Sequence, residues 1–137
     1  MLTPMALTAE DRLEVYELLA LHGHLIDAGS FERLDELFTA DFVYDVEAFG
    51  LGRLEGPEAF AAASRALGDD NPLGHHVTNP LVIGDRPGEA TVRSKGIGIL
   101  ADGTSGTVVY EDVVRRTEAG WRIARRTVIP RRRPLHA

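Results

Sequence analysis

Four segments in the second half of the chain decide the fold class: HHVTNPLVI (residues 75–83), ATVRSKGIGIL (90–100), SGTVVYEDVVRR (105–116) and WRIARRTVI (121–129). Most are rich in β-branched residues, and consecutive segments are separated by the short turn sequences GDRPGE, ADGT and TEAG. This pattern predicts an antiparallel meander of four long strands. Gly96 and Gly98 favour a bend or bulge within the second segment, so we expect a strongly curved sheet.

The first half of the chain has helical patterns with recognisable start signals. The expected helices are the segment from Thr8 to the stop at Ala28-Gly29, FERLDELF (31–38) after Ser30, and PEAFAAASRAL (57–67) with Pro57 at its first position. FVYDV (42–46) alternates like a strand. Helices followed by a meander predict an α+β fold with three N-terminal helices packed on one face of the curved antiparallel sheet.

Length and composition indicate one soluble domain. The chain has 137 residues, of which 44% are hydrophobic and 26% are charged, and we expect flexible tails at residues 1–7 and 131–137. The net charge of −6 argues against nucleic acid as a partner, and the basic triplet Arg131-Arg132-Arg133 is interpreted as a solvated terminus. No apolar run approaches the ~20 residues of a membrane span, and no signal peptide is evident, so we expect a cytoplasmic protein without a membrane partner.

The sequence offers carboxylates, imidazoles and phenols for chemistry. It has no Cys, no phosphate-binding loop, no HExxH and no GxSxG nucleophile motif. We therefore expect neither a metal nor a cofactor. The adjacent His75 and His76 point to opposite faces of a strand, so they cannot converge on one ion and only one of them can face a cavity. Periodicity alone leaves open which one does.

The order of several motifs resembles a known family. HGHLIDAGSFERLDELFTADFVYD (22–45), GPEAF (56–60), HHVTNPLVIGDRPGEATVRS (75–94) and YEDVVRRTEAGWRIARR (110–126) are together similar to the SnoaL-like, scytalone dehydratase-like branch of the superfamily that also contains ketosteroid isomerase and nuclear transport factor two. The resemblance covers nearly the whole chain. It implies a cystatin-like cone in which helices and a curved sheet enclose an apolar pocket, commonly with a homodimer through the outer sheet face.

The resemblance also implies a set of site residues. In dehydratases of this group an Asp late in the first helix lies near a His at the start of the strand after the third helix, and Asp27 and His76 occupy those places. These two are the expected catalytic residues. The expected substrate-binding residues are His22, which replaces a tyrosine of several dehydratases, together with Tyr44, Asp112 and Tyr16.

Each of these residues also has a structural interpretation. Asp27 could cap its helix, His22 could be a core or interface histidine, and Tyr44 could simply bury its ring. Asp112 is either a buried partner for an arginine or an acid kept neutral by its site. Of the neighbouring Arg125 and Arg126, one could enter the cavity, although a surface pair is favoured.

The resulting hypothesis is a cofactor-independent acid–base enzyme, a dehydratase or isomerase acting on a small apolar cyclic ketone or alcohol that is polyketide-like or steroid-like. In it, His76 moves the proton, Asp27 orients the imidazole, and Tyr44 or His22 donates to the substrate oxygen. Two alternatives remain open at this point: a non-catalytic binding or association module, and the small subunit of a ring-hydroxylating oxygenase.

Overall fold

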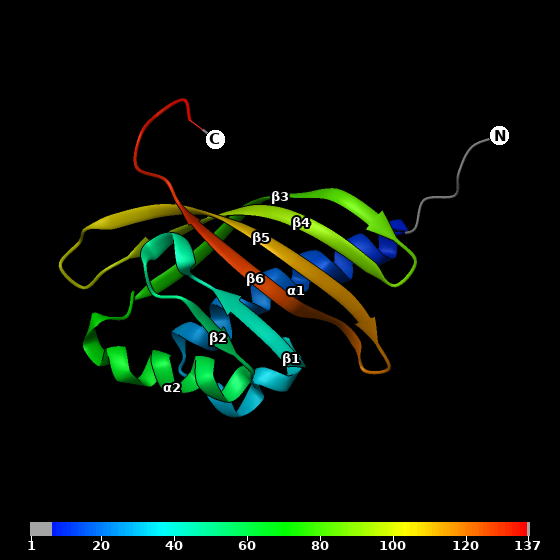
Figure 1. The fold of residues 1–137 in the computed structure, drawn as a ribbon, viewed down its shortest axis with the longest axis horizontal. Coiled ribbons are helices and arrows are strands. Elements are labelled where there is room, and N and C mark those ends of the chain that lie inside the picture. The colour runs from blue at the N-terminus through cyan, green and yellow to red at the C-terminus, as the bar shows by residue number, and fades with distance from the viewer. Residues whose placement is uncertain (1–6, 137) are drawn as a thin grey trace.

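The computed structural model describes residues 7–136, which form a curved six-stranded sheet with helices packed against it (Figure 1). In chain order the elements are α1 (Ala9–Asp27), η1 (Phe31–Glu36), β1 (Phe38–Asp45), η2 (Glu47–Phe49), β2 (Arg53–Glu55), α2 (Pro57–Leu67), η3 (Gly68–Asp70), β3 (Gly74–Arg86), β4 (Glu89–Ile99), β5 (Ser105–Thr117) and β6 (Gly120–Pro130). The strand order is β2-β1-β6-β5-β4-β3. The α+β class and the meander are confirmed.

The sheet is mixed, so the expectation of a purely antiparallel sheet is wrong. The meander strands and the β1–β2 hairpin pair antiparallel, but β1 pairs parallel with β6, with Val43 opposite Arg125. A tight turn fixes the direction of the next strand, whereas β1 and β6 are joined through α2 and four further strands. The sequence pattern also missed β2, which lies in the Gly-rich segment between β1 and α2.

Of the three expected helical segments, two are α-helices and one is a 3₁₀ helix. Thr8 and Asp11 form a capping box at the start of α1, with the Thr8 side chain accepting from the Asp11 N–H and the Asp11 carboxylate accepting from the Thr8 N–H. The segment after Ser30 is a 3₁₀ helix with no side-chain cap, and α2 begins at Pro57 as expected. Figure 1 shows α1 running across one face of the sheet and α2 beside β1 and β2.

The core lies between α1 and the inner face of the sheet. From α1 it takes Val15, Leu18, Leu19 and Leu25, and the chain entering α1 adds Leu7, which is 2% exposed although a flexible tail was expected there. Burying these side chains stabilises the fold by about 1.5–3 kcal/mol each. The same core fixes α1 against the sheet and thereby places the end of the helix over β3.

Gly96 does not mark a bulge, which was one of the two features expected there. Pairing of β4 with β5 continues without a register shift through Gly96 and Gly98. A Cβ at position 96 would lie 2.3 Å from the ring of Tyr110, which is far inside any real contact. The glycine therefore clears space for the Tyr110 ring on the inner face of the sheet.

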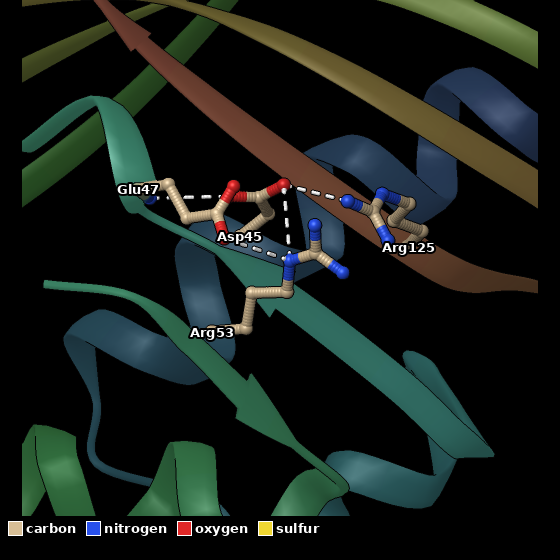
Figure 2. Close-up of polar contacts among 4 residues, drawn as sticks. All are labelled: Asp45, Glu47, Arg53 and Arg125. Carbon is tan, nitrogen blue, oxygen red and sulfur yellow. Dashed lines mark hydrogen bonds and ion pairs between the residues drawn. The ribbon is translucent and has the colours of Figure 1, made fainter.

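An ion-pair cluster on Asp45 anchors the segment that follows β1 (Figure 2). The Asp45 carboxylate accepts from Nη2 of Arg125 at 2.6 Å and from the backbone N–H of Glu47 at 3.0 Å. Nε of Arg53 donates to Glu47 at 3.1 Å and lies 4.0 Å from Asp45. Strands β1, β2 and β6 are thus tied together where residues 46–52 leave the sheet.

Within residues 7–136, no helix is long and apolar enough to cross a bilayer.

Candidate active site

A cavity of about 770 Å³ opens between the inner face of the sheet, the end of α1, α2 and the segment 46–54. Its wall is mainly apolar and includes Ile26, Leu54, Phe60, Val108 and Val128. The polar side chains on the wall are His22, Tyr44, Ser64, Asn71, His75, Thr107, Tyr110, Arg126, Arg131 and Arg132. A mainly apolar wall with few polar groups is typical of a site for a small organic molecule.

One polar pair, His75 and Asp27, lies towards the mouth. Nδ1 of His75 is 2.6 Å from Oδ1 of Asp27, and the backbone N–H of His75 donates to both carboxylate oxygens at 3.0–3.1 Å. A carboxylate can only accept, so Nδ1 carries the proton and Nε2 keeps its lone pair. The His75 and Asp27 side chains are 22% and 26% exposed, so the pair is accessible to solvent and to a ligand.

Gly23 brings this pair together. Gly23 and Asp27 are four residues apart on one face of α1, and a Cβ at position 23 would lie 2.8 Å from the carbonyl oxygen of His75. Strand β3 therefore packs directly against the helix backbone at this point. That close approach puts the His75 N–H and imidazole within reach of the Asp27 carboxylate. Asp27 does not cap α1, whose C-cap is Ala28.

A second polar cluster lies deeper in the cavity, around Arg126. This fully buried guanidinium donates from Nε and Nη2 to the two carboxylate oxygens of Asp112 at 2.7 and 2.9 Å. Its Nη1 lies 3.1 Å from Nε2 of His22, and its carbon lies 4.1 Å from the centre of the Tyr110 ring. Two charge-assisted bonds and a cation–π contact compensate the buried charge.

His22 is held neutral in this cluster. Burial, and next the positive charge of Arg126, lower its pKa well below 6.5. Because a guanidinium only donates, Nε2 of His22 must accept and Nδ1 must carry the proton. That Nδ1 is buried and has no hydrogen-bond partner among residues 7–136.

Two tyrosines complete the polar lining. Burial raises the pKa of Tyr44 to about 12 and also raises the pKa of Tyr110. Both hydroxyls therefore stay protonated at neutral pH and can donate a hydrogen bond to an oxygen in the cavity. The Tyr44 ring is held against Phe60 at 5.0 Å between centroids, so the direction of its hydroxyl is set by the aromatic core.

Comparison with known protein families identifies the chain. The model of the SnoaL-like domain matches residues 7–127, which includes α1 and all six strands except the last residues of β6. The chain belongs to the SnoaL-like family.

Relatives of this SnoaL-like protein support the fold. An uncharacterised protein of Mycobacterium tuberculosis is 32% identical over 123 residues, covering 85% of this chain and 82% of the relative. A structure from Novosphingobium aromaticivorans, described as an NTF2-like protein with a cystatin-like fold, is 33% identical with a TM-score of 0.74 and covers 88% and 82% of the two chains.

Two further structures from Novosphingobium aromaticivorans carry names that mention a reaction. A candidate aromatic ring hydroxylase is 28% identical, with a TM-score of 0.79 and 93% coverage of both chains. A candidate scytalone dehydratase is 19% identical, with a TM-score of 0.73 and coverage of 95% and 93%, so that likeness concerns the fold. The resemblance to SnoaL-like and NTF2-like proteins is confirmed, and the likeness to the candidate scytalone dehydratase is one of fold.

The structure of this SnoaL-like chain brings some of the expected site residues together and not others. His22 and Tyr44 line the cavity. Asp27 does not line it directly but is hydrogen-bonded to His75, which does. Asp112 is buried behind Arg126, which agrees with the interpretation as an arginine partner. Tyr16 does not line the cavity.

The expected placement of His76 in the cavity is wrong. His76 is exposed and pairs with Ile97 on the outer face, whereas His75 pairs with Gly98 and lines the cavity. The resemblance to the dehydratases selected His76, whereas alternation left both histidines possible. Register shifts near Asn79 and Ile83, where Asn79 adopts a positive φ of 55°, break the alternation later in β3. Val77 and Val82 both pack against the core, although they are an odd number of positions apart, and Leu81 is exposed.

The favoured interpretation of Arg125 and Arg126 as a surface pair is wrong for Arg126, which is fully buried and lines the cavity, and Tyr110 was not expected there. The pairing register supplies the signal: Tyr110, Asp112 and Val114 share the inner face of β5, and Arg126 lies opposite Asp112 on β6. A bulge between Val113 and Val114 shifts that register, so it could not be counted from the sequence. Within the described part of the chain, no group of three or more His, Cys, Asp or Glu side chains could hold a metal ion.

Proposed function

We propose that this SnoaL-like protein is an acid–base enzyme that eliminates water from, or moves a double bond in, a small apolar cyclic ketone or alcohol of polyketide-like or steroid-like shape. The observation that carries the proposal is the His75–Asp27 pair at the wall of an apolar cavity. Asp27 holds the tautomer in which Nε2 of His75 has a free lone pair, and no residue of the range 7–136 bonds that atom. A free imidazole lone pair at the cavity wall is positioned to accept a proton from a bound ligand.

The proposed reaction needs a base for a C–H proton and a donor for the developing oxygen charge. His75 Nε2 takes the proton from the carbon next to the carbonyl, and the resulting imidazolium is stabilised by the Asp27 carboxylate. The protonated hydroxyl of Tyr44 or Tyr110 donates to the enolate oxygen as its charge develops. His75 then returns the proton, to a leaving hydroxyl in a dehydration or to another carbon in an isomerisation.

The deep cluster has a supporting role in this proposal. Arg126 places a fixed positive charge behind Tyr110, and this charge favours negative charge on an oxygen bound to the hydroxyl. Asp112 is fully engaged by Arg126 and is not proposed as a proton donor. The catalytic assignment of His76 is replaced by His75, while Asp27 keeps its proposed orienting role.

The test compares His75→Ala and Asp27→Asn with the neighbouring change His76→Ala. A β,γ-unsaturated cyclic ketone and a β-hydroxy cyclic ketone serve as probes, and the absorbance of the conjugated enone reports both reactions. We expect kcat to fall about 100-fold or more in His75→Ala, and to change less than about twofold in His76→Ala.

Full activity of His75→Ala and Asp27→Asn would sink the mechanism. Binding of the ketones by the unmodified protein without any conversion would instead favour a non-catalytic binding module. His76→Ala controls for general effects on β3, because the two residues are adjacent and only one lines the cavity.

We also propose that two copies associate through the outer face of the sheet. This face presents Leu81, Ile97 and Ile99, which are 59%, 39% and 39% exposed, and His76 lies beside Ile97. A sheet face that exposes large apolar side chains and that no helix of residues 7–136 covers is suited to pairing with its own copy. Sedimentation equilibrium should give twice the chain mass, and Ile97→Glu should give the monomer mass. A monomeric unmodified protein would refute the dimer.

A further inference from the structure

The two arginines that follow β6 lie at the cavity rather than away from the molecule. Arg131 and Arg132 both line it, although the sequence pattern suggested a solvated terminus. The backbone N–H of Arg131 donates to the carbonyl of Thr107 at 3.2 Å, which continues the β5–β6 ladder beyond Pro130. The main chain is thus held at the mouth while the guanidinium groups remain available.

These two charges are not neutralised within the described residues. Arg125 and Arg126 each have a carboxylate partner, but no carboxylate of residues 7–136 lies within 4.0 Å of the guanidinium nitrogens of Arg131 or Arg132. No Asp or Glu lines the cavity either. Because Asp112 balances the charge of Arg126, Arg131 and Arg132 carry the unbalanced positive charge of the cavity wall, in a chain whose net charge is −6.

The rest of the mouth is apolar. Phe49, Leu51, Leu67 and Leu100 line it and are 39%, 72%, 53% and 37% exposed. Large exposed apolar side chains around a cavity favour contact with an apolar ligand body. Two cations among them select for a ligand that also carries a negative charge.

The strand register sets the distance between the cations and His75. His75 pairs with Gly98, Gly98 pairs with Gly106, and Gly106 falls at the level of Arg132 when the Val108–Pro130 register is continued. Three strand spacings separate His75 from Arg132, which is roughly 14 Å along the sheet. Gly98 and Gly106 line the cavity and have no side chains. A Cβ at Gly106 would meet nothing within 4 Å, whereas a Cβ at Gly98 would meet the Pro72 ring at 3.5 Å, so Pro72 borders the floor on the side of His75. An open floor therefore connects the two positions.

We propose that Arg131 and Arg132 form a carboxylate-binding subsite, and that the ligand is an elongated apolar ring compound with a carboxylate at the end remote from His75. A guanidinium binds a carboxylate with two parallel hydrogen bonds, so the pair selects both the charge and the orientation of the ligand. With the carboxylate at Arg131 and Arg132, the opposite end of the ligand lies at His75, roughly 14 Å away along the sheet. The role of the ligand end at His75 rests on the proposed function. The preference of the arginine subsite for a negatively charged ligand can be measured by binding alone, without turnover.

The experiment compares two matched probes, 4-hydroxybiphenyl and 4′-hydroxybiphenyl-4-carboxylate, by isothermal titration calorimetry at pH 7.5 and low salt. We expect the carboxylate to bind about tenfold more tightly, and we expect 0.5 M NaCl to reduce this preference. Arg131→Gln with Arg132→Gln should abolish the preference without changing the affinity for the neutral probe. Arg133→Gln is the matched control, because Arg133 belongs to the same triplet but does not line the cavity.

Equal binding of the two probes by the unmodified protein would overturn the carboxylate subsite and leave the proposed acid–base function intact. A preference retained in the double variant, or lost equally in Arg133→Gln, would also overturn it. The preference should persist in His75→Ala, which separates it from proton transfer. Failure of both probes to bind would contradict the subsite together with the apolar-ligand cavity on which the proposed function depends.

Discussion

His22 and His75 line the same cavity but have opposite electrostatic partners. His22 is buried and accepts a hydrogen bond from the guanidinium of Arg126, whereas His75 is partly exposed and donates to the carboxylate of Asp27. A proton added to His22 would place a second positive charge 3.1 Å from Arg126. A proton added to His75 would complete an ion pair with Asp27. The mouth histidine is therefore suited to gain and lose a proton, and the deep one is suited to stay neutral.

The difference extends to the carboxylates. Asp112 is fully buried and neutralises a buried cation, so its charge is needed for folding. Asp27 is a quarter exposed, and water can compensate in part for its loss. We therefore expect the deep cluster to determine stability and the mouth pair to determine activity.

The largest expected effect follows from removing the negative charge of the deep cluster. Asp112→Asn leaves Arg126 buried without a counter-ion, and we expect the free energy of unfolding to fall by about 3–5 kcal/mol. Urea unfolding followed by circular dichroism measures the change. The double variant Asp112→Leu with Arg126→Met removes both charges and should lose less stability than the single variant.

The matched change at the mouth is Asp27→Asn. It keeps an oxygen that can accept from the backbone N–H of His75, and we expect it to lower the free energy of unfolding by about 1 kcal/mol. The same urea unfolding measurement compares the two variants. If Asp27→Asn lowers the free energy of unfolding more than Asp112→Asn does, the deep cluster is not the one that determines stability, and the contrast is refuted.

The sequence predicted the regular elements because their signals are local. Helix α2 begins at Pro57 as expected, since proline at the first helical position needs no hydrogen-bonded N–H. The ends of the meander strands fall close to the expected turns, because GDRPGE, ADGT and TEAG contain the glycines that tight turns require.

The composition of the site was less predictable, because it depends on strand register. The bulge near Asn79 decides which residues of β3 share a face with His75, and the one near Val113 decides that Arg126 lies opposite Asp112. An extra residue in a strand reverses every later side chain, and its position has only a weak sequence signal. Gly23 was the available clue for His75, since a glycine inside a helix often marks the close approach of another backbone.

A smaller effect distinguishes the two histidines by pH. Burial and Arg126 hold the pKa of His22 well below its ordinary value of about 6.5. At a pH between the folded and unfolded pKa values of His22, this histidine is protonated in the unfolded chain and neutral in the folded chain. Protons therefore favour the unfolded chain, and the free energy of unfolding decreases as the pH falls below about 6.5. The slope of this contribution approaches about 1.4 kcal/mol per pH unit.

His22→Gln should remove this contribution, because glutamine does not titrate and can still accept from Nη1 of Arg126. Urea unfolding of both proteins at pH 7.5, 6.5 and 5.5 gives the comparison, in which titrations common to both chains cancel. The difference in stability should shift in favour of the variant by about 1 kcal/mol between pH 6.5 and 5.5. A pH-independent difference would mean that His22 is protonated as readily in the folded as in the unfolded chain, and the contrast between the deep and mouth histidines would then be refuted.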